Sequence, residues 1–151
     1  MTPHIRNLAL PDLDALLSLY KHLHPHDDPL PSRETVDGIW DCIMADTRQI
    51  YLGSFVDDRL IAACNAAVIL NLTRGARPYA LIENVVTHPD FRRKGIGREL
   101  LGRLIDECRN RQCYKIMLMS NSNRNEAHAF YRSIGFDQEA KQAFVITGDR
   151  K

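Results

Sequence analysis

The spacing of apolar residues changes several times along this chain, and each change predicts a new element of secondary structure. Residues 80–87 form a mostly apolar run that is typical of a buried strand, and His88-Pro89-Asp90 ends it. Over residues 98–109, apolar side chains recur at positions 100, 101, 104, 105 and 108, the spacing of one face of an amphipathic helix. A strand, a turn and a helix are therefore expected in succession.

Apolar spacing also predicts alternating strands and helices in the rest of the chain, with no internal repeat. Strands are expected at 4–8, 50–56, 60–72, 79–87, 114–120 and near 143–147. Helices are expected from Pro11 to Tyr20, from an N-cap at Ser32 to about Ala45, and over 97–111 and 124–133. Residues 22–31 and 71–78 are expected to be loops. This order predicts an α/β protein with a central mixed sheet.

The turn before the central helix contains two glycines and three basic residues, in the order Arg92-Arg93-Lys94-Gly95-Ile96-Gly97. The first N–H groups of a helix have no intrahelical partner and lie at the positive end of its dipole. Gly95 and Gly97 lack the Cβ atoms that would keep a phosphate away from the backbone. The turn therefore predicts a diphosphate site, although its spacing is neither a dinucleotide fingerprint nor a P-loop.

Two motifs resemble those of the GNAT superfamily of N-acetyltransferases. Arg-x-x-Gly-x-Gly after a strand and His-Pro is similar to the family's acetyl-coenzyme A motif, and residues 125–136 are similar to its A-x-x-F-Y-x-x-x-G-F helix. The resemblance covers roughly residues 50–147 well. It implies a single domain over 1–151, with a splayed, mixed sheet of about six to seven strands and about four helices.

The resemblance also implies acetyl-coenzyme A (acetyl-CoA) as co-substrate and no metal. The turn at 92–97 would hold the pyrophosphate, and the pantetheine amides would bind an open strand edge. By position, this edge is Val85, Val86 and Thr87, acting through backbone atoms; core packing is the alternative for the two valines.

The family commonly has an asparagine that contacts the pantetheine seven residues before its tyrosine. Arg124 occupies that position here, so Asn123 or Asn125 would substitute, and helix capping is the alternative for both. Arg124 followed by Ala127-His128 resembles a branch that contains aminoalkylphosphonate and small-amine acetyltransferases. His128 would orient a substrate there, and a surface position on the helix is the alternative.

Tyr131 occupies the position of the family's usual general acid. A phenol with an unperturbed pKa of about 10 is neutral at pH 7 and suits protonation of a departing thiolate. The alternative is that Tyr131 packs beside Phe130 and Phe136, with Gly135 ending the helix.

The base that deprotonates the amine is less well defined. Some family members have a glutamate on the strand after the cofactor helix, but the matching position here is Met119. Glu83 is the strongest remaining carboxylate, because a charge in an apolar strand is costly to bury unless it is used. Glu83 is therefore a candidate base or ammonium-binding group. A salt bridge or hydrogen bond at the sheet end is the alternative role, and Glu126 is a weaker candidate.

Histidines and aspartates alternate in the loop at 22–31 without the spacing of a zinc site. In the resembled fold this loop borders the acceptor pocket, so Asp27 or Asp28 would attract an amine; solvated loop charge is the alternative. The four cysteines show no C-x-x-C spacing, and we expect reduced, buried thiols in a cytoplasmic protein.

Charge and hydropathy exclude several classes of partner. A formal net charge of +1 gives no overall attraction to nucleic acid or an anionic membrane. No long apolar run or signal-peptide pattern occurs, so no membrane contact is expected. A homodimer is left open.

These features predict transfer of acetyl to a primary amine of a small molecule, by direct attack in a ternary complex. A non-catalytic acyl-CoA sensor is one alternative, and an enzyme that acetylates a protein N-terminus or lysine is another. The acceptor stays open among aminoalkylphosphonates, amino sugars, polyamines and amino-acid analogues.

Overall fold

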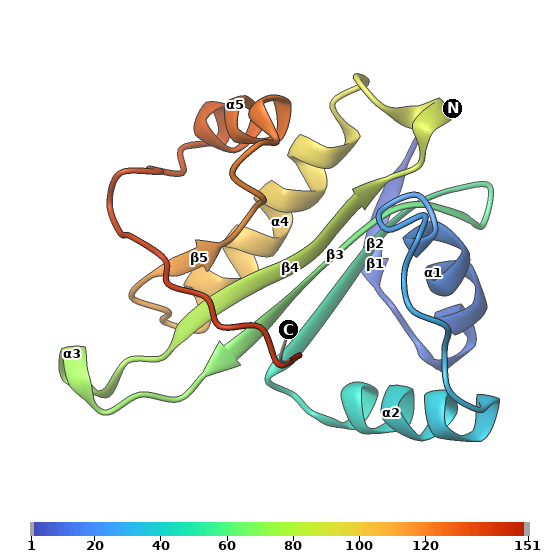
Figure 1. The fold of residues 1–151 in the computed structure, drawn as a ribbon, viewed down its shortest axis with the longest axis horizontal. Helices are drawn as coiled ribbons and strands as arrows, with labels where there is room; N and C mark the ends of the chain where they lie inside the picture. The colour runs from blue at the N-terminus through green and yellow to red at the C-terminus, as the bar shows by residue number, and fades with distance from the viewer. Residues whose placement is uncertain (1, 150–151) are drawn as a thin grey trace. The chain divides into compact units, whose positions relative to one another are not determined.

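The computed structural model describes residues 2–149 and contains a mixed five-stranded sheet in the order β1-β2-β3-β4-β5 (Figure 1). The strands are β1 (His4–Asn7), β2 (Gln49–Val56), β3 (Arg59–Ile69), β4 (Tyr79–Thr87) and β5 (Ile116–Leu118). The first four strands pair antiparallel, whereas β5 runs parallel to β4. A parallel neighbour needs a crossover connection, and the central predicted helix supplies it.

The chain divides into two compact units, Met1–Leu118 and Met119–Lys151, and the whole sheet belongs to the first. The first unit also contains η1 (Leu10–Asp12), α1 (Leu13–Tyr20), α2 (Arg33–Ala45), α3 (Thr73–Ala76), η2 (Pro89–Phe91) and α4 (Ile96–Asn110). The second contains α5 (Asn125–Ile134), which ends at Gly135 with a left-handed φ of 118°, as predicted. A single domain over 1–151 stays a prediction.

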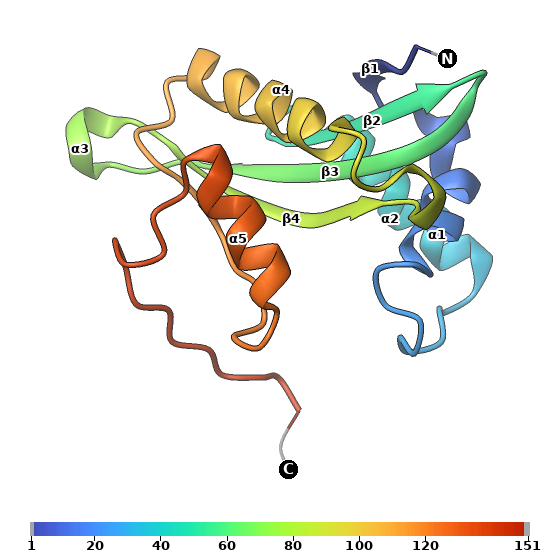
Figure 2. The same ribbon diagram turned by 90° about the horizontal axis from the view of Figure 1, so that it is seen from above.

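Helices cover both faces of the sheet in the first unit, with α4 on one face and α1 and α2 on the other (Figure 2). The predicted apolar stripe of α4 is buried, since Leu100, Leu101 and Leu104 are at most 1% exposed. The opposite core joins Leu16 and Trp40 to side chains of β2, β3 and β4. Cover on both faces explains why β2 and β3 are buried almost throughout. Within residues 2–149, no helix is long and apolar enough to cross a membrane.

Two polar contacts fix the start and the position of α2. Ser32 is the N-cap of α2, as predicted, because its Oγ accepts from the Thr35 N–H at 3.2 Å. The Trp40 indole Nε1 donates to the Leu10 carbonyl at 3.1 Å, which ties α2 to η1. The Trp40 hydrogen bond thus holds α2 against the short helix that precedes α1.

Some details of the sequence-based expectations are wrong. The sheet has five strands in the described residues, not six to seven, because residues 143–147 are irregular, with Phe144 and Ile146 92% and 99% exposed. Apolar and β-branched residues favour a strand, but a strand forms only where a neighbouring strand pairs with it. The predicted loop at 71–78 contains α3. Cys42 lies on the exposed side of α2, whereas Cys64 and Cys108 are buried as expected.

Candidate active site

A bulge interrupts β4 near its middle. The pairing of β3 with β4 passes from Asn65↔Glu83 to Ala63↔Val86, so β4 has one residue more than β3 across this step. Asn84 has a φ of 53°, a conformation that asparagine adopts more readily than most residues. Its Nδ2 donates to Oδ1 of the buried Asn65 at 3.2 Å. The bulge therefore bends the strand and interrupts the ladder of hydrogen bonds here.

The second half of β4 has a strand neighbour on one side only. In the described residues β5 pairs with Ala80–Ile82, whereas β3 pairs with β4 as far as Thr87. The predicted pantetheine-binding residues Val85, Val86 and Thr87 all lie on this stretch. Val86 is 4% exposed and belongs to the core, so its side chain packs while its backbone lies on the strand edge. Such an edge can bind an extended chain that carries amide groups.

Hydrogen bonds to its own backbone order the turn that follows β4. The Arg92 Nε donates to the Thr87 carbonyl, and the Lys94 Nζ donates to the Asp90 carbonyl, both at 3.0 Å. Arg93 lies between them with a left-handed φ of 61° and is exposed. The three predicted cations are therefore placed around a fixed turn at the start of α4.

The helix that follows begins at a glycine with open space beside it. Gly95 is the N-cap of α4 with a φ of 81°, and a Cβ there would meet no atom within 4 Å. The first intrahelical donor is the Glu99 N–H, which bonds to the Gly95 carbonyl at 3.0 Å. Ile96 and Gly97 precede it, at the positive end of the dipole of a 15-residue helix. This geometry suits the predicted diphosphate.

Glu83 is exposed, which corrects the expectation that its carboxylate is a buried charge. The strand register sets Tyr51, Asn65 and Glu83 opposite one another on β2, β3 and β4. Residues paired in this way share a face of the sheet, and here it is the face that carries α1 and α2. Because the carboxylate is solvated, burial no longer supports a function for it. The support for a function of Glu83 is now its position beside the bulge in β4.

A cavity of about 250 Å³ lies between α1, α2 and the same face of the sheet. Asn84 and Tyr51 line it from the strands, and most of the remaining wall is apolar, with Leu30 and Ile39 among its members. The cavity was not predicted from the sequence, because side chains of α1, α2 and two strands form it together. Ile39 is 54% exposed and Leu30 is 62% exposed. The sequence signal that could have indicated a cavity was therefore the presence of more apolar residues on α2 and the loop before it than the core covers.

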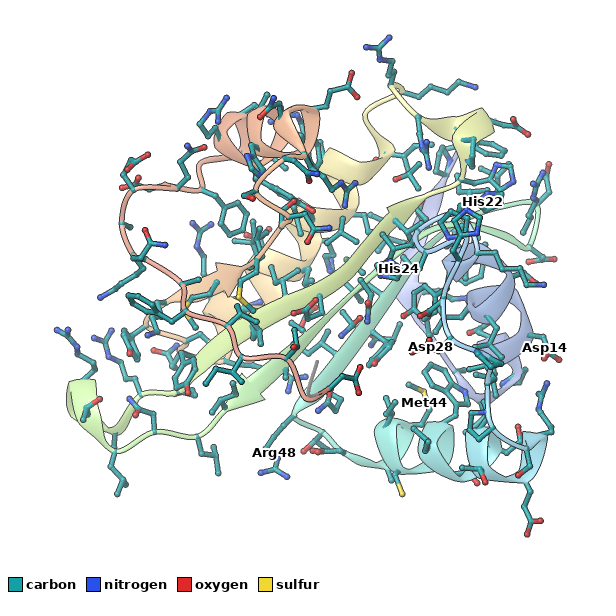
Figure 3. All side chains as sticks on the ribbon, viewed as in Figure 1. Asp14, His22, His24, Asp28, Met44 and Arg48 are labelled. Carbon is teal, nitrogen blue, oxygen red and sulfur yellow. The ribbon has the colours of Figure 1, made fainter. Side chains whose placement is uncertain are left out.

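The histidine-bearing loop reaches the end of β4 through His22. Its ring centroid lies 4.5 Å from that of His88, and Arg59 Nη2 lies 3.0 Å from His88 Nε2. Partial burial, and then the Arg59 charge, lower the pKa of His88 below its usual value. Figure 3 shows the side chains of His22, His24 and Asp28 spread along the loop. In the part of the chain that the structure describes, no cluster of three or more His, Cys, Asp or Glu could hold a metal ion.

Tyr131 belongs to the second unit. It is half-buried in α5, with its ring centroid 5.4 Å from that of Phe130 and 6.1 Å from that of Phe136. The Tyr131 carbonyl accepts from the Phe136 N–H at 3.1 Å, so the residues after the helix fold back onto it. The predicted aromatic packing is therefore present.

The start of α5 corrects the capping alternative for two asparagines. Arg124 is the N-cap and makes no side-chain cap hydrogen bond, while Asn125 is the first helical residue and Asn123 precedes the cap. Both asparagines are exposed, and their contact with pantetheine stays a prediction. His128 is half-buried rather than fully exposed, and its Nε2 lies 2.8 Å from the Asn121 carbonyl. That hydrogen bond ties the helix to the segment before it.

A strand edge that leads through a glycine turn into a helix N-terminus is an arrangement that can bind an extended ligand carrying a diphosphate. The chain belongs to the acetyltransferase (GNAT) family, whose model matches residues 13–136. The match includes both motifs and extends into both units. Enzymes of this family use acetyl-CoA as co-substrate.

Individual relatives act on different amines. The chain is 34% identical over 91 residues to a ribosomal protein bS18-alanine N-acetyltransferase of Salmonella typhimurium, covering 60% of this chain and 57% of the relative. It is 31% identical over 84 residues to a glucosamine 6-phosphate N-acetyltransferase of Trypanosoma brucei brucei, covering 56% and 55%. The chain thus spans little more than half the length of these curated relatives.

A solved structure resembles the chain over nearly its whole length. It is a putative acetyltransferase from Agrobacterium tumefaciens, with a TM-score of 0.89 and 35% identity, covering 95% of this chain and 99% of that one.

Proposed function

We propose that the protein is an acetyl-CoA-dependent N-acetyltransferase that transfers acetyl to a primary amine of a small molecule. The observation that carries this proposal is the continuity of three features in the first unit. The free edge of β4, the basic turn and the N-terminus of α4 follow one another along 83–97. An edge for two amides followed by a site for a diphosphate matches the order of groups along coenzyme A.

In the proposed reaction the amine attacks the thioester carbonyl directly in a ternary complex. A C–N bond forms and the C–S bond breaks. The ammonium loses one proton before attack, the attacking nitrogen loses a second as the amide forms, and the departing thiolate gains one, so one proton is released overall. Tyr131 donates the proton to the thiolate as general acid. Glu83 binds the ammonium and takes its proton, directly or through water. Val85, Val86 and Thr87 bind pantetheine through the backbone, and Asn123 or Asn125 adds a side-chain contact.

The first prediction tests the cofactor site through a matched pair of variants at the helix N-cap. Gly95→Asp and Gly95→Asn have nearly the same shape, and both side chains tolerate a left-handed φ. Only the aspartate places a negative charge beside the pyrophosphate. We expect Gly95→Asp to weaken coenzyme A binding at least about 10-fold more than Gly95→Asn, measured by titration calorimetry. Equal affinities of the two variants for coenzyme A would contradict a diphosphate site at this turn.

One observation favours a second function. The relative from Salmonella typhimurium acts on a ribosomal protein alanine, and it is 34% identical over the matched residues. A peptide N-terminus as acceptor is therefore the second candidate. Parallel assays of a peptide and of free amines, both scored by release of the coenzyme A thiol, distinguish the two. A protein that binds coenzyme A but releases no thiol with any acceptor would instead be a sensor.

A further inference from the structure

We infer that the acceptor is a primary amine attached to an apolar or aromatic group, and that this group occupies the cavity between α1, α2 and the sheet. The inference rests on the proposed function and adds the class of substrate to it. It depends on three observations: the chemistry of the cavity walls, the polar groups at one side of the cavity, and its volume.

The walls of the cavity contain no residue that is ionised at neutral pH. They consist of aliphatic side chains, Trp40, Tyr20, Tyr51 and Asn84. Burial raises the pKa of both tyrosines, so their phenols stay neutral. A phosphate or a second ammonium placed there would lose its hydration without gaining an ionic partner. The wall therefore disfavours amino sugar phosphates, aminoalkylphosphonates, polyamines and aminoglycosides.

Polar groups for the amine lie where the cavity meets β4. Asn84 lines the cavity, and its Nδ2 is bonded to Asn65, which leaves its carbonyl oxygen to accept from an amine. Glu83 is the preceding residue, lies on the same face of the sheet as Tyr51, and supplies a negative charge complementary to an ammonium. An apolar amine would thus have its hydrocarbon part against α1 and α2 and its nitrogen at the bulge.

The volume suits a single ring or a branched chain. An apolar cavity of about 150 Å³ accepts benzene, and this cavity measures about 250 Å³. A phenylethyl group fits with little space left over. The exposed apolar residues Leu30 and Ile39 also line the cavity, so an apolar ligand would cover surface that otherwise faces water.

A binding experiment tests this without turnover, because Trp40 is the single tryptophan of the chain and lines the cavity. We expect 2-phenylethylamine and isoamylamine to change Trp40 emission saturably, and putrescine and glucosamine 6-phosphate to leave it unchanged. In the acetyl-transfer assay, kcat/KM for 2-phenylethylamine should exceed that for ethanolamine by roughly 10–100-fold, the effect of burying one aromatic group.

Filling the cavity should reduce that preference. Ile43 lines the cavity and is half-buried, so Ile43→Phe should lower the ratio of kcat/KM for 2-phenylethylamine over ethanolamine by at least about 10-fold. Leu72→Phe is the matched control, because Leu72 is 92% exposed and lies outside the cavity; its ratio should match the wild type.

The outcomes separate the two proposals. Turnover of glucosamine 6-phosphate or putrescine as well as 2-phenylethylamine, or an unchanged ratio in folded Ile43→Phe, would overturn the apolar acceptor and leave the acetyltransferase intact. Should Ile43→Phe not fold, the Trp40 titration of the wild type decides alone. Absence of both coenzyme A binding and acetyl transfer would overturn the proposed function, while a saturable Trp40 response would still support the apolar site.

Discussion

Asn84 connects the main features of the first unit at the scale of a single residue. Its left-handed φ of 53° makes the bulge in β4, its amide bonds to Asn65, and its side chain lines the cavity. A residue with a branched or apolar side chain would be strained in this conformation and would leave Asn65 without that bond. One asparagine thus shapes both the strand edge and the acceptor cavity.

A prediction about protonation of the leaving group concerns Tyr131. Tyr131→Phe keeps the ring packing against Phe130 and Phe136 but removes the hydroxyl. If the phenol protonates the thiolate, kcat should fall by roughly 10²–10⁴-fold while coenzyme A affinity stays unchanged. Steady-state kinetics and calorimetry measure the two quantities. A variant with wild-type kcat would assign the residue to packing alone.

Glu83 carries the prediction for the amine. Glu83→Gln should lower kcat/KM, and the deficit should shrink as the pH approaches the pKa of the acceptor, since free amine needs no base. Rates are compared at equal concentrations of amine over pH 7–10. Because Glu83 is exposed, the substitution should leave the thermal midpoint almost unchanged. A deficit that is constant across this range would mean that Glu83 positions the amine and does not deprotonate it.

At the scale of elements, an ion pair between β1 and η1 positions the start of α1, whose side chains line the cavity. Arg6 Nη1 and Nη2 donate to the two carboxylate oxygens of Asp12 at 2.7 and 3.0 Å, and Asp12 also accepts from the Ala9 N–H at 2.7 Å. These hydrogen bonds hold the pKa of Asp12 below its usual value; those from Arg6 contribute most, and the one from Ala9 contributes less.

Removing this charge should cost stability in a pH-dependent way. Asp12→Asn should lower the free energy of unfolding at pH 7 by about 1 kcal/mol, because Arg6 is partly exposed and water screens the pair. A lowered carboxyl pKa stabilises above the unfolded value of about 3.9, and this stability is lost as pH falls through the folded pKa. Urea unfolding should show the full difference between the variant and the wild type at pH 7 and a smaller difference at pH 3, where protonation of the carboxyl has begun to remove it.

The matched control for this prediction is Asp37→Asn. Asp37 pairs with Arg33 at 2.7 Å, but both side chains are at least half exposed. We therefore expect that substitution to lower the free energy of unfolding by at most about 0.5 kcal/mol. Equal losses for the two variants would show that the link between β1 and η1 adds nothing beyond a surface ion pair.

At the scale of the whole molecule, the candidate residues fall into two compact units. The strand edge, the glycine turn, Glu83 and the acceptor cavity belong to the first, and Tyr131 with the two asparagines belongs to the second. The family match over 13–136 includes both sets. Tyr131→Phe and Gly95→Asp therefore test the candidate residues of the two units separately.

The sequence by itself determined the elements whose signals are local. The apolar run before His88, the stripe of α4 and the glycine turn predicted β4, α4 and their order within a residue or two, because periodicity and capping act over one or two turns of chain. Ser32 and Gly135 were found as helix ends for the same reason. The two motifs also identified the family before any contact was known.

Only the tertiary structure decided what depends on neighbours distant in sequence. The bulge at Asn84 exists because β3 pairs on both sides of it, and that pairing brings Glu83 into register with Asn65 and Tyr51 on an exposed stretch of the sheet. The cavity forms where α1, α2 and two strands meet, and no single segment encodes it. Residues 143–147 had the composition of a strand, but no strand within residues 2–149 pairs with them. Local pattern sets which conformation a segment prefers, and tertiary packing sets which partner, and therefore which exposure, each side chain has.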